Sequence, residues 1–94
     1  MNYSELRSVL LSKGEAIEDR SGNHIFFYIE VDGQEYRATK VSHGARGQID
    51  ARLASLIARQ MRLTGGELKE FVACPLSREE WVERWRARGP AWRF

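Results

Sequence analysis

An Asp-Gly pair at positions 32 and 33 joins two strand-like runs of residues. Asp-Gly is one of the strongest signals for a two-residue hairpin turn, because these residues accept the backbone angles that such a turn requires. The run before the pair, 24–31, is apolar at every second position, which is typical of a strand with one buried face. We therefore expect an antiparallel hairpin formed by residues 24–31 and 34–41.

The two-residue turn also predicts the register of the hairpin. Ile25, Phe27, Ile29 and Val31 are expected to face the core. Counted from the turn, Lys40 is then expected opposite Ile25. The residues expected on the other face of the sheet are His24, Phe26, Tyr28, Arg37 and Thr39. A titratable imidazole beside aromatic rings on one surface predicts a site there.

The rest of the chain is expected to be mainly helical. Helices are predicted over 2–13, 48–63, 64–73 and 77–88, with a short strand over 15–20. Three of the helices begin with capping-box motifs, in which a side chain at the start and an acidic side chain three residues later bond each other's backbone. These motifs are Asn2 with Glu5, Thr64 with Glu67, and Ser77 with Glu80. The predicted buried stripe of the second helix is Ile49, Leu53, Leu56, Ile57 and Met61.

This order of elements predicts an α+β fold: a helix, a three-stranded antiparallel sheet, a second helix and two C-terminal helices. The 94 residues are long enough for one domain, in which 1–63 form the core and 64–94 a helical extension. One layer of helices covers only one side of a sheet. The face of His24 is therefore exposed to solvent, covered by the C-terminal helices, or used for binding.

Composition excludes several classes of protein. A single cysteine, Cys74, rules out an internal disulfide and a cysteine-rich zinc site, and favours the reducing cytoplasm. No apolar run approaches the ~18 residues that a membrane-spanning helix needs. No carboxylate pair or cluster of metal ligands is apparent, so we expect no metal ion and no cofactor. The formal charge of +2 permits nucleic-acid binding without requiring it.

Residues 3–63 resemble the HicA family of bacterial RNA-cleaving toxins, which are partnered by HicB antitoxins. The resemblance rests on a first helix that ends at Lys13-Gly14, on Gly22-Asn23-His24 leading into a strand, and on His43 before the second helix. It implies a double-stranded-RNA-binding-like fold of helix, three strands and helix. The chain departs from the family pattern at Asn23, which is usually serine, and in the extension 64–94, which minimal HicA toxins lack.

The resemblance implies that His24 is the catalytic residue, and His43 is a second candidate. An imidazole can transfer protons while the 2′-hydroxyl of RNA attacks the neighbouring phosphate, so no metal ion is needed. Residues expected to bind the RNA are Lys40, Arg37 or Arg46 at the phosphate and Tyr28 or Phe26 at a base. The family also implies an acidic HicB-like antitoxin that binds the face of His24.

An alternative interpretation depends on Trp81 and Trp85, which lie one helical turn apart beside Val82. If their helix packs across the sheet, Phe26 and Tyr28 become residues of a second core. If it packs on a dimer mate or on another protein, the two tryptophans anchor an interface. Either arrangement predicts a non-catalytic module for RNA binding or protein interaction.

Overall fold

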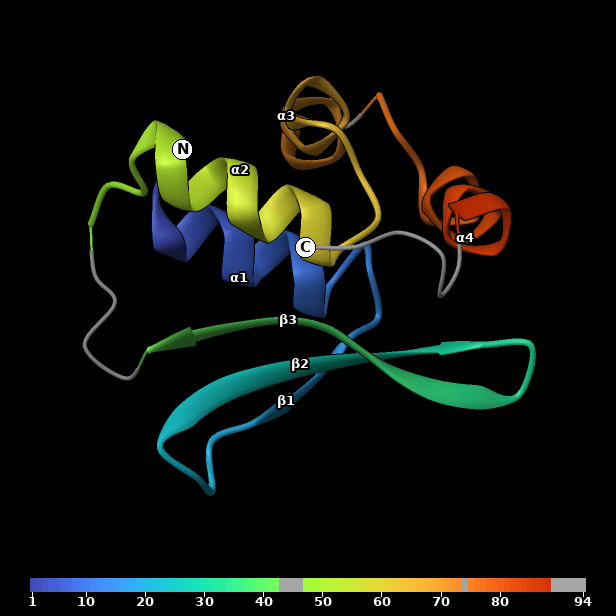
Figure 1. Cartoon of the computed structure of the whole chain (residues 1–94), viewed down its shortest axis with the longest axis horizontal. Helices are drawn as coiled ribbons and strands as arrows, with labels where there is room; N and C mark the ends of the chain where they lie inside the picture. The colour runs from blue at the N-terminus through green and yellow to red at the C-terminus, as the bar shows by residue number, and fades with distance from the viewer. Residues whose placement is uncertain (43–46, 74, 89–94) are drawn as a thin grey trace.

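The computed structural model describes residues 1–42, 47–73 and 75–88. The described elements are α1 (Tyr3–Leu11), β1 (Ile17–Asp19), β2 (His24–Val31), β3 (Gln34–Ser42), α2 (Ala51–Gln60), α3 (Gly65–Ala73) and α4 (Arg78–Arg88). The predicted α+β class and the predicted order of elements are confirmed (Figure 1).

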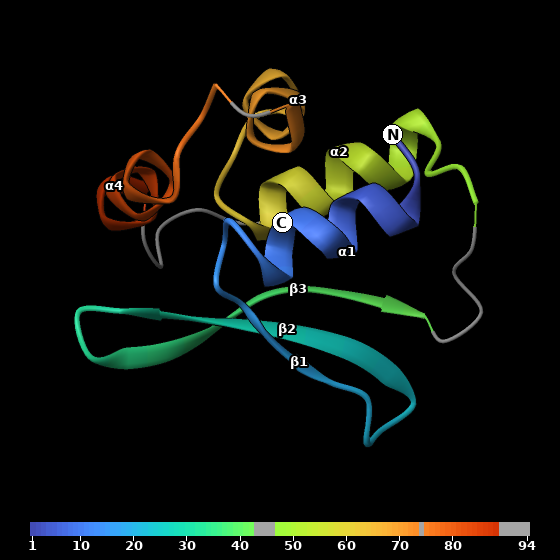
Figure 2. The same ribbon diagram turned by 180° about the vertical axis from the view of Figure 1, so that it is seen from behind.

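The sheet has the strand order β1-β2-β3, and both neighbouring pairs are antiparallel. Opposite views agree that every described helix lies on the same side of this sheet (Figures 1 and 2). α1 and α2 run side by side over it, and α4 lies above the end of the hairpin near the turn. No described helix lies on the other face, so the interpretation in which α4 packs across the face of His24 is wrong.

The starts of the helices follow from local hydrogen bonds. All three capping boxes predicted from the sequence are formed, at Asn2, Thr64 and Ser77. α2 begins at Ala51, three residues later than expected, because Asp50 caps it by accepting from the backbone N–H of Leu53. The preceding backbone pairs with the N-terminus instead, through the bond from the N–H of Ile49 to the oxygen of Met1.

The predicted buried stripe of α2 is wrong in part. Leu53 and Leu56 are 36% and 43% exposed, whereas Ile57 and Met61 are fully buried. The inward positions are Ala54, Ile57, Ala58 and Met61, spaced by three and four residues as one helix face requires. The two alanines allow close packing of α2 on its neighbours, so the helix is turned and its leucines at 53 and 56 face outward.

The C-terminal helices belong to the same hydrophobic core as the sheet. Phe71 of α3 and Trp81 of α4 are buried in one cluster with Phe27 of β2 and Leu10 of α1. The rings of Phe71 and Trp81 pack with their centroids 4.9 Å apart. Residues 65–88, apart from Cys74, which lies outside the described residues, therefore complete the helical layer above the sheet.

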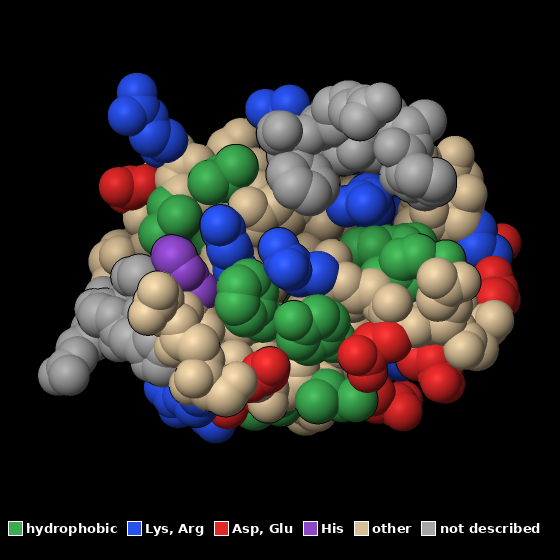
Figure 3. Space-filling view, turned by 60° about the horizontal axis from the view of Figure 1, so that its bottom comes forward, with side chains coloured by type: hydrophobic (Ala, Val, Ile, Leu, Met, Phe, Trp, Pro, Cys, Tyr) green, Lys and Arg blue, Asp and Glu red, His purple; other side chains and the backbone are tan. Residues whose placement is uncertain are grey.

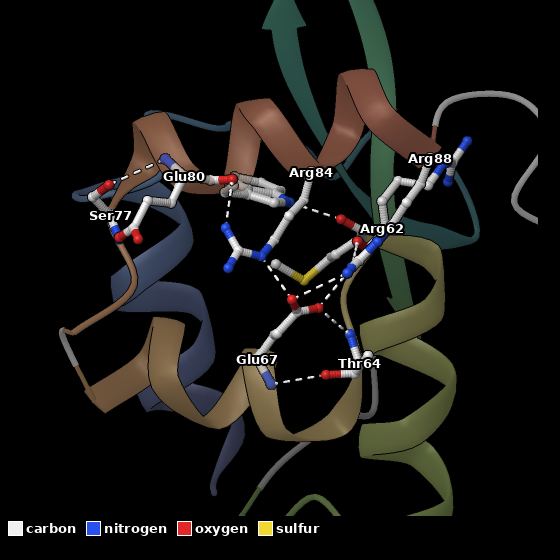
Figure 4. Close-up of polar contacts among 9 residues, drawn as sticks. Arg62, Thr64, Glu67, Ser77, Glu80, Arg84 and Arg88 are labelled. Atoms are coloured by element: carbon white, nitrogen blue, oxygen red, sulfur yellow. Dashed lines mark hydrogen bonds and ion pairs between the residues drawn. The ribbon is translucent and has the colours of Figure 1, made fainter.

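A partly buried carboxylate, that of Glu67, joins α3 to α4 (Figure 4). Glu67 accepts from Arg84 and from Arg88 at 2.6 Å each, and from the backbone N–H of Thr64 at 2.8 Å. The hydrogen bond from Arg88 is the main cause that lowers the pKa of Glu67 to about 2, and the Thr64 and Arg84 bonds act in the same direction. Burial opposes this shift, because it favours the neutral acid.

Candidate functional site on the open sheet face

β2 presents three of the predicted site residues on the uncovered face of the sheet. His24, Phe26 and Tyr28 are partly exposed and alternate with the buried Ile25 and Phe27. The alternation arises because successive side chains of a strand point to opposite faces. The predicted placement of these three residues is confirmed.

β3 departs from the predicted register through a β-bulge. The turn pairs Tyr28 with Arg37 as expected, but the register then shifts, and Phe27 pairs with Thr39 instead of Ala38. Both Ala38 and Thr39 are consequently buried. The prediction that Thr39 lies on the open face is wrong, because the extra residue at the bulge turns its side chain inward.

The same bulge brings Lys40 into the site. The predicted register placed Lys40 opposite Ile25, facing the core, whereas the structure pairs it with Phe26 on the open face. Val41 pairs with Ile25, and both are buried. The shift by one residue therefore exchanges Lys40 and Val41 between the two faces of β3. We call His24, Phe26, Tyr28, Arg37 and Lys40 together the sheet-face site.

The rings of this site form a row along β2. The centroids of His24 and Phe26 are 6.2 Å apart, and those of Phe26 and Tyr28 are also 6.2 Å apart. Successive rings are tilted by 54° and 40°, so they present separate surfaces to solvent instead of one continuous stack. Figure 3 shows hydrophobic side chains on this face beside a histidine and several Lys or Arg side chains.

Arg37 is held against the aromatic row. Its guanidinium carbon lies 4.5 Å from the centroid of the Phe26 ring, a distance at which a cation–π contact is favourable. This contact fixes a charged and planar group on the sheet surface. Lys40, exposed on the same strand, adds a second positive charge beside Phe26.

Charge is distributed unevenly along the open face. Two cations, Lys40 and Arg37, and one carboxylate, that of Asp19 opposite Phe26, lie toward the His24 end of the face, while Glu30 and Glu35 oppose each other near the turn. An anionic ligand is therefore attracted to the His24 end and repelled from the turn. Ile17 of β1, which pairs with Tyr28, extends the apolar part of the face and is 58% exposed. Ile17 was not among the predicted site residues, although its place in the short strand indicated it.

The imidazole of His24 contacts the ring of Phe26. Among the described residues it makes no hydrogen bond, so neither ring nitrogen is committed to a partner there. The two other predicted site residues, His43 and Arg46, lie outside the described residues.

Trp81 and Trp85 do not form an exposed surface. They are 0% and 4% exposed, and their rings meet edge to face with centroids 6.4 Å apart. Trp85 also contacts Tyr36 of β3, and the guanidinium of Arg62 lies 4.3 Å from its centroid. The structure does not support the predicted role of the two tryptophans as interface anchors, because both side chains are buried by packing within this chain.

A groove runs between β3 and the helices α2 and α4. Its volume is about 570 Å³, and its described lining includes Tyr36, Lys40, Leu56, Gln60, Arg62 and Trp85. The groove also reaches Tyr28 and Arg37, so it is continuous with the sheet-face site. We call it the β3–α2 groove. The groove was not predicted from the sequence. The one sequence signal that could have indicated it is Gln60, a polar residue beside the buried positions of an amphipathic helix.

In the described ranges, no group of three His, Cys, Asp or Glu side chains is arranged to hold a metal ion. No helix in the described part of the chain is long and apolar enough to cross a membrane. Comparisons with protein-family models, with curated proteins and with solved structures find no match for this chain. The sheet-face site and the β3–α2 groove are the candidate binding surfaces of the described residues.

Proposed function

We propose that this protein binds single-stranded RNA across the sheet-face site and cleaves it, with His24 as the proton carrier. The observation that carries the proposal is the row of rings along β2, flanked by Arg37 and Lys40, on a face that no described helix covers. Single-stranded RNA is commonly bound in this way, with bases on aromatic rings and the phosphates beside cations.

The spacing of the rings favours a splayed strand. The centroid distance of 6.2 Å is nearly twice the rise of about 3.4 Å per nucleotide in a stacked duplex strand. An RNA strand that follows β2 must therefore be extended, with its bases separated from one another. Arg37 contributes a second planar surface, because a guanidinium can stack on a base while it pairs with a phosphate.

An extended strand suits cleavage by the 2′-hydroxyl of the RNA itself. His24 removes the proton of this hydroxyl, and the oxygen attacks the adjacent phosphorus. The bond to the 5′-oxygen breaks, and the protonated imidazole returns the proton to that oxygen. The products are a 2′,3′-cyclic phosphate and a 5′-hydroxyl, and Lys40 or Arg37 stabilises the additional negative charge on the phosphate during the step.

The resemblance to HicA toxins supports this assignment, because it identifies the same histidine from the Gly22-Asn23-His24 sequence. It adds an acidic HicB-like antitoxin as a partner, which would cover the positively charged end of the sheet-face site and exclude RNA. A cytoplasmic location follows from the proposed substrate.

The decisive experiment separates binding from cleavage. A fluorescent 12-nucleotide RNA and a DNA of the same sequence are incubated with the protein in a chelator. Wild type is expected to bind both and to cut only the RNA, because DNA lacks the 2′-hydroxyl. His24→Ala is expected to cut about 10²–10⁴ times more slowly even at protein concentrations that saturate RNA binding. Phe26→Ala is expected to weaken binding about 10- to 100-fold by removing a stacking ring.

Equal cleavage by wild type and His24→Ala would remove His24 from the mechanism. Binding without cleavage would favour the second candidate, a non-catalytic RNA-binding module. The observation that favours it is that, in the described part of the chain, no second titratable side chain is hydrogen-bonded to the imidazole of His24. Absence of RNA binding would overturn both.

A further inference from the structure

The β3–α2 groove contains a buried amide whose hydrogen bonds are only partly used. Gln60, at the last position of α2, is 9% exposed, and its Oε1 accepts from the hydroxyl of Thr39 at 2.6 Å. The same oxygen accepts from the backbone N–H of Lys40 at 3.3 Å. Because a backbone N–H only donates, the atom that faces Lys40 must be the oxygen of the amide.

This arrangement leaves the amide nitrogen of Gln60 as a donor toward the groove. No hydrogen bond of this nitrogen to another described residue is formed, and it is not among the buried polar atoms that lack a partner. It is therefore accessible. The groove thus offers a fixed N–H donor, while its acceptor is already occupied by Thr39 and Lys40.

The remaining lining is apolar and positively charged. Tyr36 and Leu56 are 36% and 43% exposed, and Arg37 and Lys40 lie at the border with the sheet-face site. None of the described lining residues is acidic. A volume of about 570 Å³ lies within the usual range of small-molecule sites, so the groove is large enough for one planar ring.

We infer that the β3–α2 groove receives one base of the RNA strand that crosses the sheet-face site, and that it prefers a keto base, uracil or guanine, to adenine. This inference rests on the proposed function and adds base selectivity to it. The phosphate of the seated nucleotide lies near Arg37 and Lys40, which the groove shares with the sheet-face site.

The preference follows from the Gln60 amide, whose oxygen is already hydrogen-bonded within the protein while its nitrogen bonds to no other described residue. A glutamine recognises adenine through two bonds, in which its oxygen accepts from the amino group and its nitrogen donates to a ring nitrogen. The oxygen of Gln60 is committed to Thr39 and Lys40, so the first of these bonds is blocked. The free donor instead matches the exocyclic keto oxygen, O4 of uracil or O6 of guanine. Adenine carries an amino group at the corresponding position, which only donates and so meets the N–H of Gln60 donor to donor.

The test uses fluorescent 12-nucleotide RNAs of cytidine that carry one central uridine, guanosine or adenosine, with binding measured by fluorescence anisotropy. Wild type is expected to bind the uridine and guanosine RNAs about fivefold or more tightly than the adenosine RNA. Gln60→Glu keeps an oxygen toward Thr39 and Lys40 but replaces the N–H donor, and is expected to abolish the preference. Thermal melting verifies that this variant is folded.

A second variant does not depend on the buried amide. Leu56→Trp places a large ring at the wall of the groove and is expected to abolish the preference while the sheet-face site still binds RNA. Leu53→Trp is the matched control, because Leu53 is a similarly exposed leucine of α2 outside the groove lining. It is expected to keep the preference of wild type.

The outcomes separate this inference from the proposed function. RNA binding by wild type without discrimination among the three central bases overturns the inference and leaves the proposed function standing. Identical preferences in Leu56→Trp and Leu53→Trp overturn it as well. Failure of wild type to bind any of the RNAs overturns both.

Discussion

Trp81 of α4 donates its indole Nε1–H to the main-chain oxygen of Met61, 2.7 Å away. Both residues are fully buried, and Met61 directly follows α2, the helix that packs beside α1 over the sheet. The bond therefore links α4 to the end of α2, and so to the helices that cover the sheet. It also satisfies a carbonyl oxygen that has no access to water.

Replacing Trp81 with phenylalanine should destabilise the fold by about 2–4 kcal/mol, because it shrinks a core side chain and leaves a buried oxygen unpaired. Urea unfolding followed by circular dichroism measures the change. Trp85→Phe is the matched control, since it removes a similar volume from α4 and no hydrogen bond of its indole is formed with another described residue. Equal losses in the two variants would show that the bond to Met61 contributes little.

Gly14→Ala is expected to destabilise the protein by about 1–3 kcal/mol. A Cβ atom at this position would lie 2.8 Å from the main-chain oxygen of Leu10 and 3.1 Å from the ring of Trp81. Gly65→Ala serves as the control, because a Cβ there meets no atom within 4 Å. Thermal melts should show a lower midpoint for Gly14→Ala and little change for Gly65→Ala; the reverse order would contradict the packing of α4 against the end of α1.

Lowering the pH should destabilise the contact between α3 and α4, because it protonates the carboxylate of Glu67 that joins them. Its pKa is about 2 in the folded protein against 4.5 ordinarily, a difference that corresponds to about 3 kcal/mol. Because the folded-state pKa is the lower one, this stabilisation is complete above about pH 5 and is lost as the pH falls from about 4.5 toward 2. Glu67→Gln should therefore be clearly less stable than wild type at pH 6, and the gap should narrow at pH 2.5.

Asp32→Asn provides the comparison for that experiment. Asp32 pairs with Arg86 at 2.6 Å, but both side chains are more than half exposed, so the pair is largely screened by water. Asparagine also suits the turn position before Gly33. We expect urea unfolding of this variant to stay close to wild type at every pH. A gap for Glu67→Gln that is constant between pH 6 and pH 2.5 would contradict the assigned role of its carboxylate.

RNA affinity should depend on salt through the cations of the sheet-face site. Removing one cation that binds a phosphate should reduce the slope of log affinity against log salt by about 0.7 for a single strand. Arg37→Gln and Lys40→Gln should each show this reduction in anisotropy titrations between 50 and roughly 200 mM salt. Lys69→Gln, at an exposed position of α3, should keep the slope of wild type. An unchanged slope in all three variants would place the phosphates elsewhere.

Much of the fold was predictable because its signals are local. The capping boxes at Asn2, Thr64 and Ser77 depend on residues only three positions apart, and the Asp32-Gly33 turn depends on two neighbours. The outward positions of His24 and Phe26 followed from the alternation within β2. Each of these features is specified by a short segment, and the rest of the chain does not override it.

The features that were missed depend on long-range packing. The bulge in β3 is stabilised where Thr39 meets Gln60, a residue 21 positions away on α2. The rotation of α2 that exposes Leu53 depends on which of its faces packs on the core. The docking of α4 depends on contacts of Trp81 and Arg78 with the helix–strand junction at Gly14. No periodicity within a single segment carries this information.

The bulge in β3 has a consequence for comparing this chain with others. The alternation of buried and exposed residues along β3 shifts by one position at Ala38. A similar strand that lacks the extra residue can therefore be aligned correctly only if a one-residue gap is placed there. An ungapped alignment would match Lys40 with a core position and Val41 with a surface position. A relative that uses the same cation could then appear to lack it.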